Sequence, residues 1–302
     1  MHHPRLCFLP GLLLACMGTL HAQSPAVSPS PVATPVMAET RELRDIPYVV
    51  DGHERQRLDL YLPAAGEPAR PLVVWVHGGG WAGGNKTNCP AKWLVARGYV
   101  VAAINYRLSQ HALYPAQIED CKAAIRFLRV HAPEYGIKPD RIGAWGASAG
   151  GHLVSLLGTT GDLRDLDGGA NPDQSSKVEC VVDWFGPTDF LHYGEPPTPA
   201  LDTATSAVAK LIGGTIAANP EKARQASPLY FVKKGAPPFL IMHGDKDGLV
   251  PLQQSQILES ALNKCGTECT LKILPGAGHG TPEFYTQPSL ATILQFLDRH
   301  LK

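Results

Sequence analysis

The stretch Arg141-Ile142-Gly143-Ala144-Trp145-Gly146-Ala147-Ser148-Ala149-Gly150-Gly151-His152-Leu153 is the most informative part of this sequence. It joins an apolar, strand-like run to the pattern G-x-S-x-G at residues 146–150 and then to a helix-like run. A sharp turn from strand to helix would expose the Ser148 hydroxyl, and such a strained turn needs glycine neighbours. By itself the pattern is weak, because Gly-, Ala- and Ser-rich segments produce it by chance. Its meaning therefore depends on partners elsewhere in the chain.

Apolar strands alternate with helices around this turn. Strands are predicted at residues 72–77, 99–105, 141–146, 178–185, 238–243 and 269–274, and helices at 90–97, 116–131, 149–157, 251–263 and 286–301. Such alternation is typical of an α/β fold with a mostly parallel central sheet and helices on both faces. Residues 46–50 and 58–62 flank Asp51-Gly52, which predicts an antiparallel hairpin before the sheet.

A long insertion interrupts this rhythm at about residues 187–236. It contains a Pro-rich piece and a helical piece at residues 203–212. Insertions at the carboxyl end of a strand often form lids in α/β proteins, so we expect a small cap over the site.

A serine hydroxyl needs a general base and an acidic residue that orients the base. After a nucleophilic serine on such a turn, these partners follow in the order Asp or Glu, then His. Asp247 follows the strand at 238–243, and His279 lies in Gly276-Ala277-Gly278-His279-Gly280 after the last strand. Asp245 competes with Asp247, but it lies just past the strand end and is expected to cap the loop. We therefore expect Ser148, Asp247 and His279 to be catalytic.

The sequence His77-Gly78-Gly79-Gly80-Trp81 directly follows a buried strand. Glycines let backbone N–H groups point at an oxyanion, and this arrangement forms one arm of an oxyanion hole, while the residue after the nucleophile forms the other. We expect the donors to be Gly79, Gly80 and Ala149. A flexible glycine turn is the structural alternative.

Three aromatic residues end or follow strands on the same side, namely Trp81, Tyr106 and Trp184. They could bind substrate, although packing is the more common role of aromatic residues. The remaining polar residues in regular elements are expected to be structural: His77, His152, His243, Asp120 and Asp183.

The composition excludes several classes of function. The 302 residues include 27 Lys plus Arg and 27 Asp plus Glu, so no basic excess points to nucleic acid. Past residue 22 there are five cysteines, without a C-x-x-C pair or a His cluster, which argues against a metal site. Cys265 and Cys269 are close enough in sequence for a disulfide clip. No cofactor is expected.

The first 22 residues resemble a secretory signal, with a short basic start and an apolar run from 6 to 20. Cleavage before Gln23 is favoured, but Leu13-Leu14-Ala15-Cys16 resembles a lipobox in which Cys16 would carry lipid. Residues 23–43 then form a Pro- and Ser-rich linker, and residues 44–302 the folded domain. The mature protein is expected to be secreted or periplasmic, without a transmembrane segment.

Together these motifs resemble the α/β-hydrolase superfamily, and within it the hormone-sensitive-lipase-like and BD-FAE-type esterases. The resemblance covers residues 45–302 and includes Asn105-Tyr106-Arg107-Leu108, Tyr114-Pro115-Ala116 and the segment 184–189. Lipase-like members usually carry Asp before the nucleophile, and Ala147 here favours the BD-FAE side. The resemblance implies a serine carboxylesterase acting on a small ester or an esterified carbohydrate, such as acetyl or feruloyl esters of plant polysaccharide. A prolyl-oligopeptidase-like peptidase shares this fold and residue order, and an inactive adhesion protein is a third possibility.

Overall fold

The computed structural model describes residues 40–64, 66, 68–193 and 203–302. The predicted signal peptide, Cys16 and most of the predicted linker lie outside these residues. The linker was predicted to extend to residue 43, but the first strand already begins at Arg41. No helix within the described part of the chain is both long and apolar enough to span a membrane.

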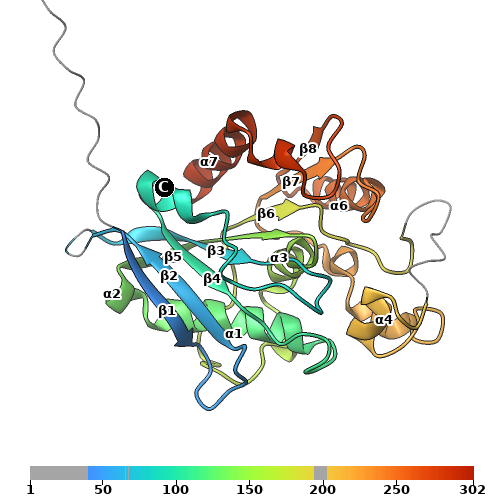
Figure 1. Ribbon diagram of the computed structural model, residues 1–302, viewed down its shortest axis with the longest axis horizontal. Helices are drawn as coiled ribbons and strands as arrows, with labels where there is room; N and C mark the ends of the chain where they lie inside the picture. The colour runs from blue at the N-terminus through green and yellow to red at the C-terminus, as the bar shows by residue number, and fades with distance from the viewer. Residues whose placement is uncertain (1–39, 65, 67, 194–202) are drawn as a thin grey trace, which may run out of the picture. The chain divides into compact units, whose positions relative to one another are not determined.

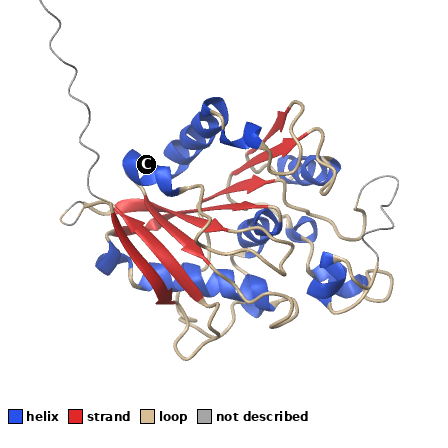
Figure 2. Cartoon of the chain, in the orientation of Figure 1, coloured by secondary structure: helices blue, strands red, loops and turns tan. Residues whose placement is uncertain are grey.

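An eight-stranded sheet forms the centre of the domain (Figures 1 and 2). Its strands are β1 (Arg41–Pro47), β2 (Arg57–Leu62), β3 (Arg70–Val76), β4 (Val100–Ile104), β5 (Ile137–Ala147), β6 (Cys180–Trp184), β7 (Phe239–Gly244) and β8 (Cys269–Leu274). The order is β1-β2-β4-β3-β5-β6-β7-β8. The pairs β1–β2 and β2–β4 are antiparallel, and all other pairs are parallel. The predicted α/β architecture is therefore confirmed.

Helices cover both faces of the sheet (Figure 1). The longer helices are α1 (Ala116–Val130), α3 (Ala149–Thr160), α6 (Gln253–Lys264) and α7 (Gln287–Leu301), and the short ones include α2 (Ala132–Tyr135), η1 (Lys92–Arg97) and η5 (Pro282–Tyr285). Alternate residues of the central strands point to opposite faces. In β3, Val74 packs in the core under α1, α3 and α6, whereas Trp75 packs in the core under η1 and α7.

The predicted hairpin exists but has different boundaries. Its first strand was placed at residues 46–50, whereas β1 ends at Pro47 and residues 48–56 form a long connection. A bulge near Asp45, whose φ is 56°, shifts the register between Leu43 and Ile46. Gln56 then holds the connection closed, because its Oε1 accepts the His53 N–H at 2.7 Å. Backbone hydrogen bonds close the same connection, from the Tyr48 N–H to Gln56 O at 3.1 Å and from the Gly52 N–H to Val49 O at 3.4 Å. The Asp-Gly turn therefore lies inside a longer loop and does not join the two strands directly.

The insertion at 187–236 contains α4 (Ala207–Ile212), α5 (Pro220–Gln225) and η4 (Pro228–Phe231). Residues 194–202, which include its Pro-rich piece, lie outside the described residues. The disulfide clip considered for Cys265 and Cys269 does not form, because all five cysteines among the described residues are free. Cys265 directly follows α6 and is partly exposed, whereas Cys269 is the first residue of β8 and packs against the core.

Candidate active site

Ser148 forms a strained turn between β5 and α3. Its φ is 57° and its ψ is −121°, a backbone conformation that L-residues rarely adopt. The turn is held because the Ser148 N–H donates to the carbonyl of Trp184 at 2.8 Å. A Cβ on Gly146 would lie 2.3 Å from the carbonyl oxygen of Gly150, and one on Gly150 would lie 2.1 Å from that of Val76. The backbone therefore requires glycine at both positions that flank the serine in the pattern.

The structure brings Ser148, His279 and Asp247 together at the carboxyl edge of the sheet. The Ser148 Oγ lies 2.9 Å from His279 Nε2, and His279 Nδ1 lies 2.8 Å from Asp247 Oδ2. The loop after β8 carries His279, and the loop after β7 carries Asp247. The Asp247 carboxylate can only accept a hydrogen bond, so the ring proton of neutral His279 lies on Nδ1 and the Nε2 lone pair faces the serine hydroxyl. This arrangement can remove the hydroxyl proton.

The side chain of Asp247 is fully buried and accepts several hydrogen bonds. The N–H groups of Leu249 and Val250 donate to its Oδ1 at 2.8 and 2.9 Å. Burial alone would raise the pKa of Asp247, but hydrogen bonds with His243, His279 and the two amides lower it well below its ordinary value. Asp247 therefore stays ionised beside the imidazole.

His243 and Asp245 have supporting roles. His243 Nε2 lies 2.8 Å from the carbonyl of Val250 and 3.4 Å from Asp247 Oδ2, and its Nδ1 lies 2.6 Å from the Ser255 hydroxyl. His243 is therefore the buried, hydrogen-bonded histidine that the sequence predicts. Asp245 accepts the Gly276 N–H at 2.7 Å and caps the loop, also as predicted.

The glycine loop after β3 lies against the serine turn. A Cβ on Gly78 would lie 2.7 Å from the carbonyl oxygen of Ala147, and one on Gly79 would lie 2.5 Å from that of Gly83. Gly79 has a φ of 113° and Gly80 a φ of 57°, both in the region that favours glycine. The close backbone approach leaves Gly79, Gly80 and Ala149 beside Ser148 in one pocket.

This pocket has a volume of about 500 Å³ and opens above Ser148 and His279. Apart from the glycines, its lining is mostly apolar and comes from the β6–α4 segment and the Asp247 loop. The side chains include those of Phe185, Pro187, Tyr193, Val208 and Leu249. The N-terminal residues of α4 reach the glycine loop, since a Cβ on Gly80 would lie 3.3 Å from the Ala207 Cβ.

Two of the three aromatic residues predicted to bind substrate do not line the pocket. Tyr106 is fully buried, and its hydroxyl donates to the carbonyl of His77 at 3.0 Å. Trp184 is also fully buried and packs edge-on against Trp145 at a ring distance of 4.9 Å. Trp81 borders the pocket, but its indole N–H donates inward to His152 at 3.2 Å.

Phe185 and Tyr193 line the pocket but were not predicted from the sequence. Phe185 directly follows β6 with a φ of 43°, and its ring lies 4.5 Å from that of His279. The position after the carboxyl end of a parallel strand was the available signal, because ligands bind at that edge. Tyr193 lies in the insertion and carries no comparable signal.

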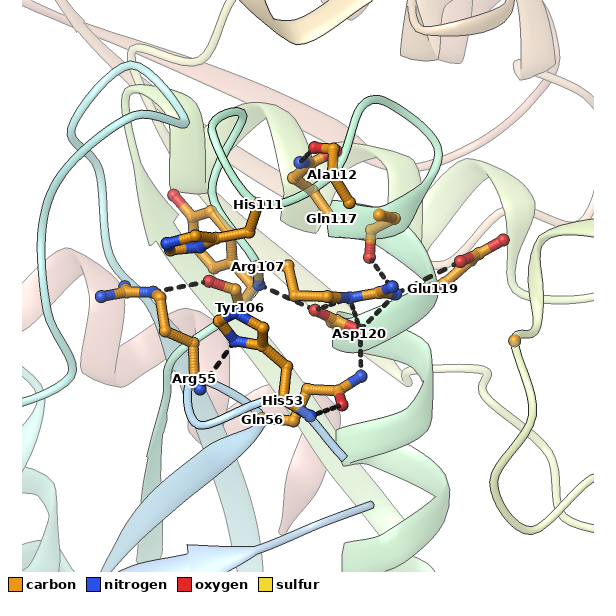
Figure 3. A network of polar contacts seen from close by, with 12 residues as sticks. His53, Arg55, Gln56, Tyr106, Arg107, His111, Ala112, Gln117, Glu119 and Asp120 are labelled. Carbon is orange, nitrogen blue, oxygen red and sulfur yellow. Dashed lines mark hydrogen bonds and ion pairs between the residues drawn. The ribbon is translucent and has the colours of Figure 1, made fainter. Parts of the chain in front are cut away.

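The other polar residues predicted to be structural are buried and paired. The carboxylate of Asp120 in α1 accepts hydrogen bonds from Arg107 and Gln56 (Figure 3). Gln56 Nε2 lies 2.6 Å from Asp120 Oδ1. Asp183 Oδ1 accepts the Gly186 N–H at 2.9 Å, and His152 Nε2 donates to the carbonyl of Ala226 at 2.6 Å. Within the described residues, no three His, Cys, Asp or Glu side chains form a possible metal site.

The sequence profile of the BD-FAE family matches residues 58–262. The chain belongs to the BD-FAE family. Among the BD-FAE chain's relatives is the "Esterase LipC" of Mycobacterium tuberculosis, which is 31% identical over 214 residues, covering 70% of this chain and 53% of LipC. The chain thus spans about half the length of this curated relative.

Two solved structures share the fold of this BD-FAE chain closely. One is a truncated carbohydrate esterase from gut microbiota, with a TM-score of 0.81 and 32% identity over 88% of this chain and 98% of the other. The second is a bifunctional GH43-CE protein of Bacteroides eggerthii, with a TM-score of 0.81 and 36% identity over 86% of this chain and 35% of the other.

Proposed function

We propose that this chain is a serine carboxylesterase. The observation that carries the proposal is the hydrogen-bonded row from Asp247 through His279 to Ser148, which ends in a pocket bordered by the glycine loop. Esterases among the relatives support the same conclusion.

In the proposed reaction, Ser148 Oγ attacks the ester carbonyl carbon while His279 Nε2 takes the hydroxyl proton. Asp247 orients the imidazole and stabilises its positive charge. The N–H groups of Gly79, Gly80 and Ala149 stabilise the negative oxygen of the tetrahedral intermediate. His279 then gives its proton to the leaving alcohol, and a water activated by His279 releases the acid from Ser148.

We propose a short-chain or aromatic acyl group, such as acetyl or feruloyl, carried on a carbohydrate. The apolar lining of the pocket supports an acyl group at this position, and its volume of about 500 Å³ lies within the range of small-molecule sites. The carbohydrate esterases among the structural relatives support a sugar alcohol. The first 22 residues suggest export, which would bring the protein to such substrates. The mass of the mature protein would distinguish cleavage before Gln23 from lipidation of Cys16.

The test compares the wild type with Ser148→Ala on p-nitrophenyl acetate, methyl ferulate, acetylated xylan and a proline-containing amide. Ester turnover should fall by about 10⁶-fold in the variant, as for nucleophile knockouts in other serine hydrolases. Wild-type labelling by a fluorophosphonate at Ser148 is expected as well. Faster amide than ester turnover would favour a peptidase, and an unlabelled, inactive wild type would refute hydrolysis at this site.

A further inference from the structure

We propose that Arg55 is a positioning residue for the oxyanion loop, defined here as residues 77–86. Arg55 lies outside every motif of the site, in the connection between β1 and β2. It acts through His77 on the peptide group that carries the Gly79 N–H. The inference rests on the proposed function, in which Gly79 is an oxyanion donor.

Arg55 holds three separate segments together with one guanidinium group. Its Nε donates to the carbonyl of Tyr106 just after β4 at 2.9 Å (Figure 3). Its Nη2 lies 3.1 Å from the carbonyl oxygen of Gly84 and 3.1 Å from His77 Nε2. Arg55 therefore contacts the oxyanion loop at its first residue and again near its end.

The contact with Arg55 selects one tautomer of His77. A guanidinium can only donate hydrogen bonds, so His77 Nε2 must accept and the ring proton must lie on Nδ1. His77 Nδ1 lies 2.7 Å from the carbonyl oxygen of Gly78 and donates to it. Burial lowers the pKa of His77 to about 4, and the charge of Arg55 acts in the same direction, so the ring is neutral near pH 7.

The His77 tautomer in turn fixes the direction of the Gly79 N–H. In a trans peptide group the carbonyl and the next N–H point in opposite directions. Because Gly78 O points at His77, the Gly79 N–H points away from it, on the side of the group opposite the imidazole. The backbone of Gly84 packs closely against the hydrogen bond between His77 and Gly78, since a Cβ on Gly84 would lie 2.3 Å from Gly78 O.

Without Arg55, only the hydrogen bond to Gly78 O keeps the proton of His77 on Nδ1, so the Nε2–H tautomer becomes more populated. Its Nδ1 lone pair would then face the lone pairs of Gly78 O, and the peptide group would lose its anchor. The donor at Gly79 would be misdirected rather than removed. Since an oxyanion donor acts mainly in the transition state, kcat should fall while KM changes little.

The experiment measures kcat and KM for p-nitrophenyl acetate in Arg55→Met, Arg55→Lys and a control, Arg57→Met. The exposed Arg57 also donates to a backbone carbonyl, that of Asp45 at 2.9 Å, and not to His77 or Gly84. We expect kcat of Arg55→Met to fall about tenfold, less than the 10²–10³-fold loss of a deleted donor. Arg55→Lys should recover part of this loss, and Arg57→Met should behave as the wild type.

A double-mutant cycle and a direct observation of the tautomer complete the test. If Arg55 acts through His77, Arg55→Met should lower kcat no further in a His77→Gln background. The ¹⁵N shifts of His77 in histidine-labelled protein should show the Nδ1–H tautomer in the wild type and a mixture of tautomers in Arg55→Met.

Two results would overturn the inference: an Nε2–H tautomer in the wild type, or additive losses in the cycle. The ¹⁵N measurement needs no activity, so it separates failure of this inference from failure of the proposed esterase function.

Discussion

Replacement of Asp247 by Asn tests the site with a change that preserves shape. The two backbone N–H groups that donate to Oδ1, at 2.8 and 2.9 Å, would hold the amide oxygen of Asn at that position. In the opposite orientation, the amide NH₂ would face the N–H groups of Leu249 and Val250. Both N–H groups would then lack an acceptor, which costs about 1–3 kcal/mol each. The NH₂ group therefore replaces Oδ2, 2.8 Å from His279 Nδ1.

In that position the NH₂ group donates to His279 Nδ1 and moves the ring proton to Nε2. The imidazole then presents a proton, instead of a lone pair, to Ser148 Oγ at 2.9 Å. A wrong tautomer of this kind costs about 10⁴-fold in kcat, or about 5.5 kcal/mol, in the serine protease where it has been studied. We expect a loss of that size in kcat for p-nitrophenyl acetate, with KM little changed.

Asp245→Asn is the matched control from the same loop. Asp245 only accepts the Gly276 N–H at 2.7 Å, and an Asn oxygen can take over this bond. Its kcat should stay within about twofold of the wild type, because its side chain does not contact Ser148, His279 or Asp247 and the change in activation free energy stays below about 0.5 kcal/mol. Circular dichroism and thermal unfolding check that both variants fold. If folded Asp247→Asn keeps more than a tenth of wild-type kcat, the assigned orientation of the base is wrong. The same holds if Asp245→Asn loses more of its kcat than Asp247→Asn does.

Three further predictions concern stability and substrate contacts. Gly150→Ala should lower the free energy of unfolding by more than about 3 kcal/mol, because its Cβ would lie 2.1 Å from a backbone oxygen of β3; unchanged urea unfolding would contradict this. His152 has its pKa lowered to about 4 by burial, so the unfolded state binds its proton first as pH falls below about 6.5, and stability drops between pH 6.5 and 4 by up to about 3 kcal/mol. That part of the decrease should disappear in His152→Gln, and identical pH profiles of unfolding for the two proteins would refute it. Tyr106→Phe should cost about 1 kcal/mol of stability without raising KM, and a raised KM would restore a substrate role for Tyr106.

The fold followed from the sequence because its signals are local and periodic. Runs such as that of β3 have no polar interruption, and the helices begin and end close to their predicted positions. The prediction was less accurate at the edge of the sheet, in the hairpin formed by β1 and β2. The connection 48–56 depends on Gln56, whose Oε1 accepts from His53 while its Nε2 reaches Asp120 in α1. A contact between residues 64 positions apart leaves no periodic trace in either segment.

In the candidate site, too, some residues could be predicted from local sequence and others could not. Ser148, Asp247 and His279 are recognisable because each needs a particular residue type beside glycines at a strand end. Tyr106 and Trp184 satisfy that positional rule too, yet their side chains point into the core. Trp184 is the last residue of β6, whereas Phe185 follows the strand with a φ of 43°. Both rings pack in the same hydrophobic cluster, but only Phe185 also borders the pocket.

Residues that position the site are harder to find than residues that perform its chemistry. A nucleophile or base must have a specific functional group, so residue type narrows the search before any geometry is known. Arg55 needs only a donor that reaches His77 Nε2, and an arginine in a polar loop is otherwise ordinary. Its significance depends on the hydrogen bond on the other side of the ring, from Nδ1 to Gly78 O. A neutral imidazole carries one proton, so one ring nitrogen accepts from Arg55 while the other donates to Gly78 O. Substitution of either partner should therefore alter the other bond, and this coupling is visible only when all three residues are seen together.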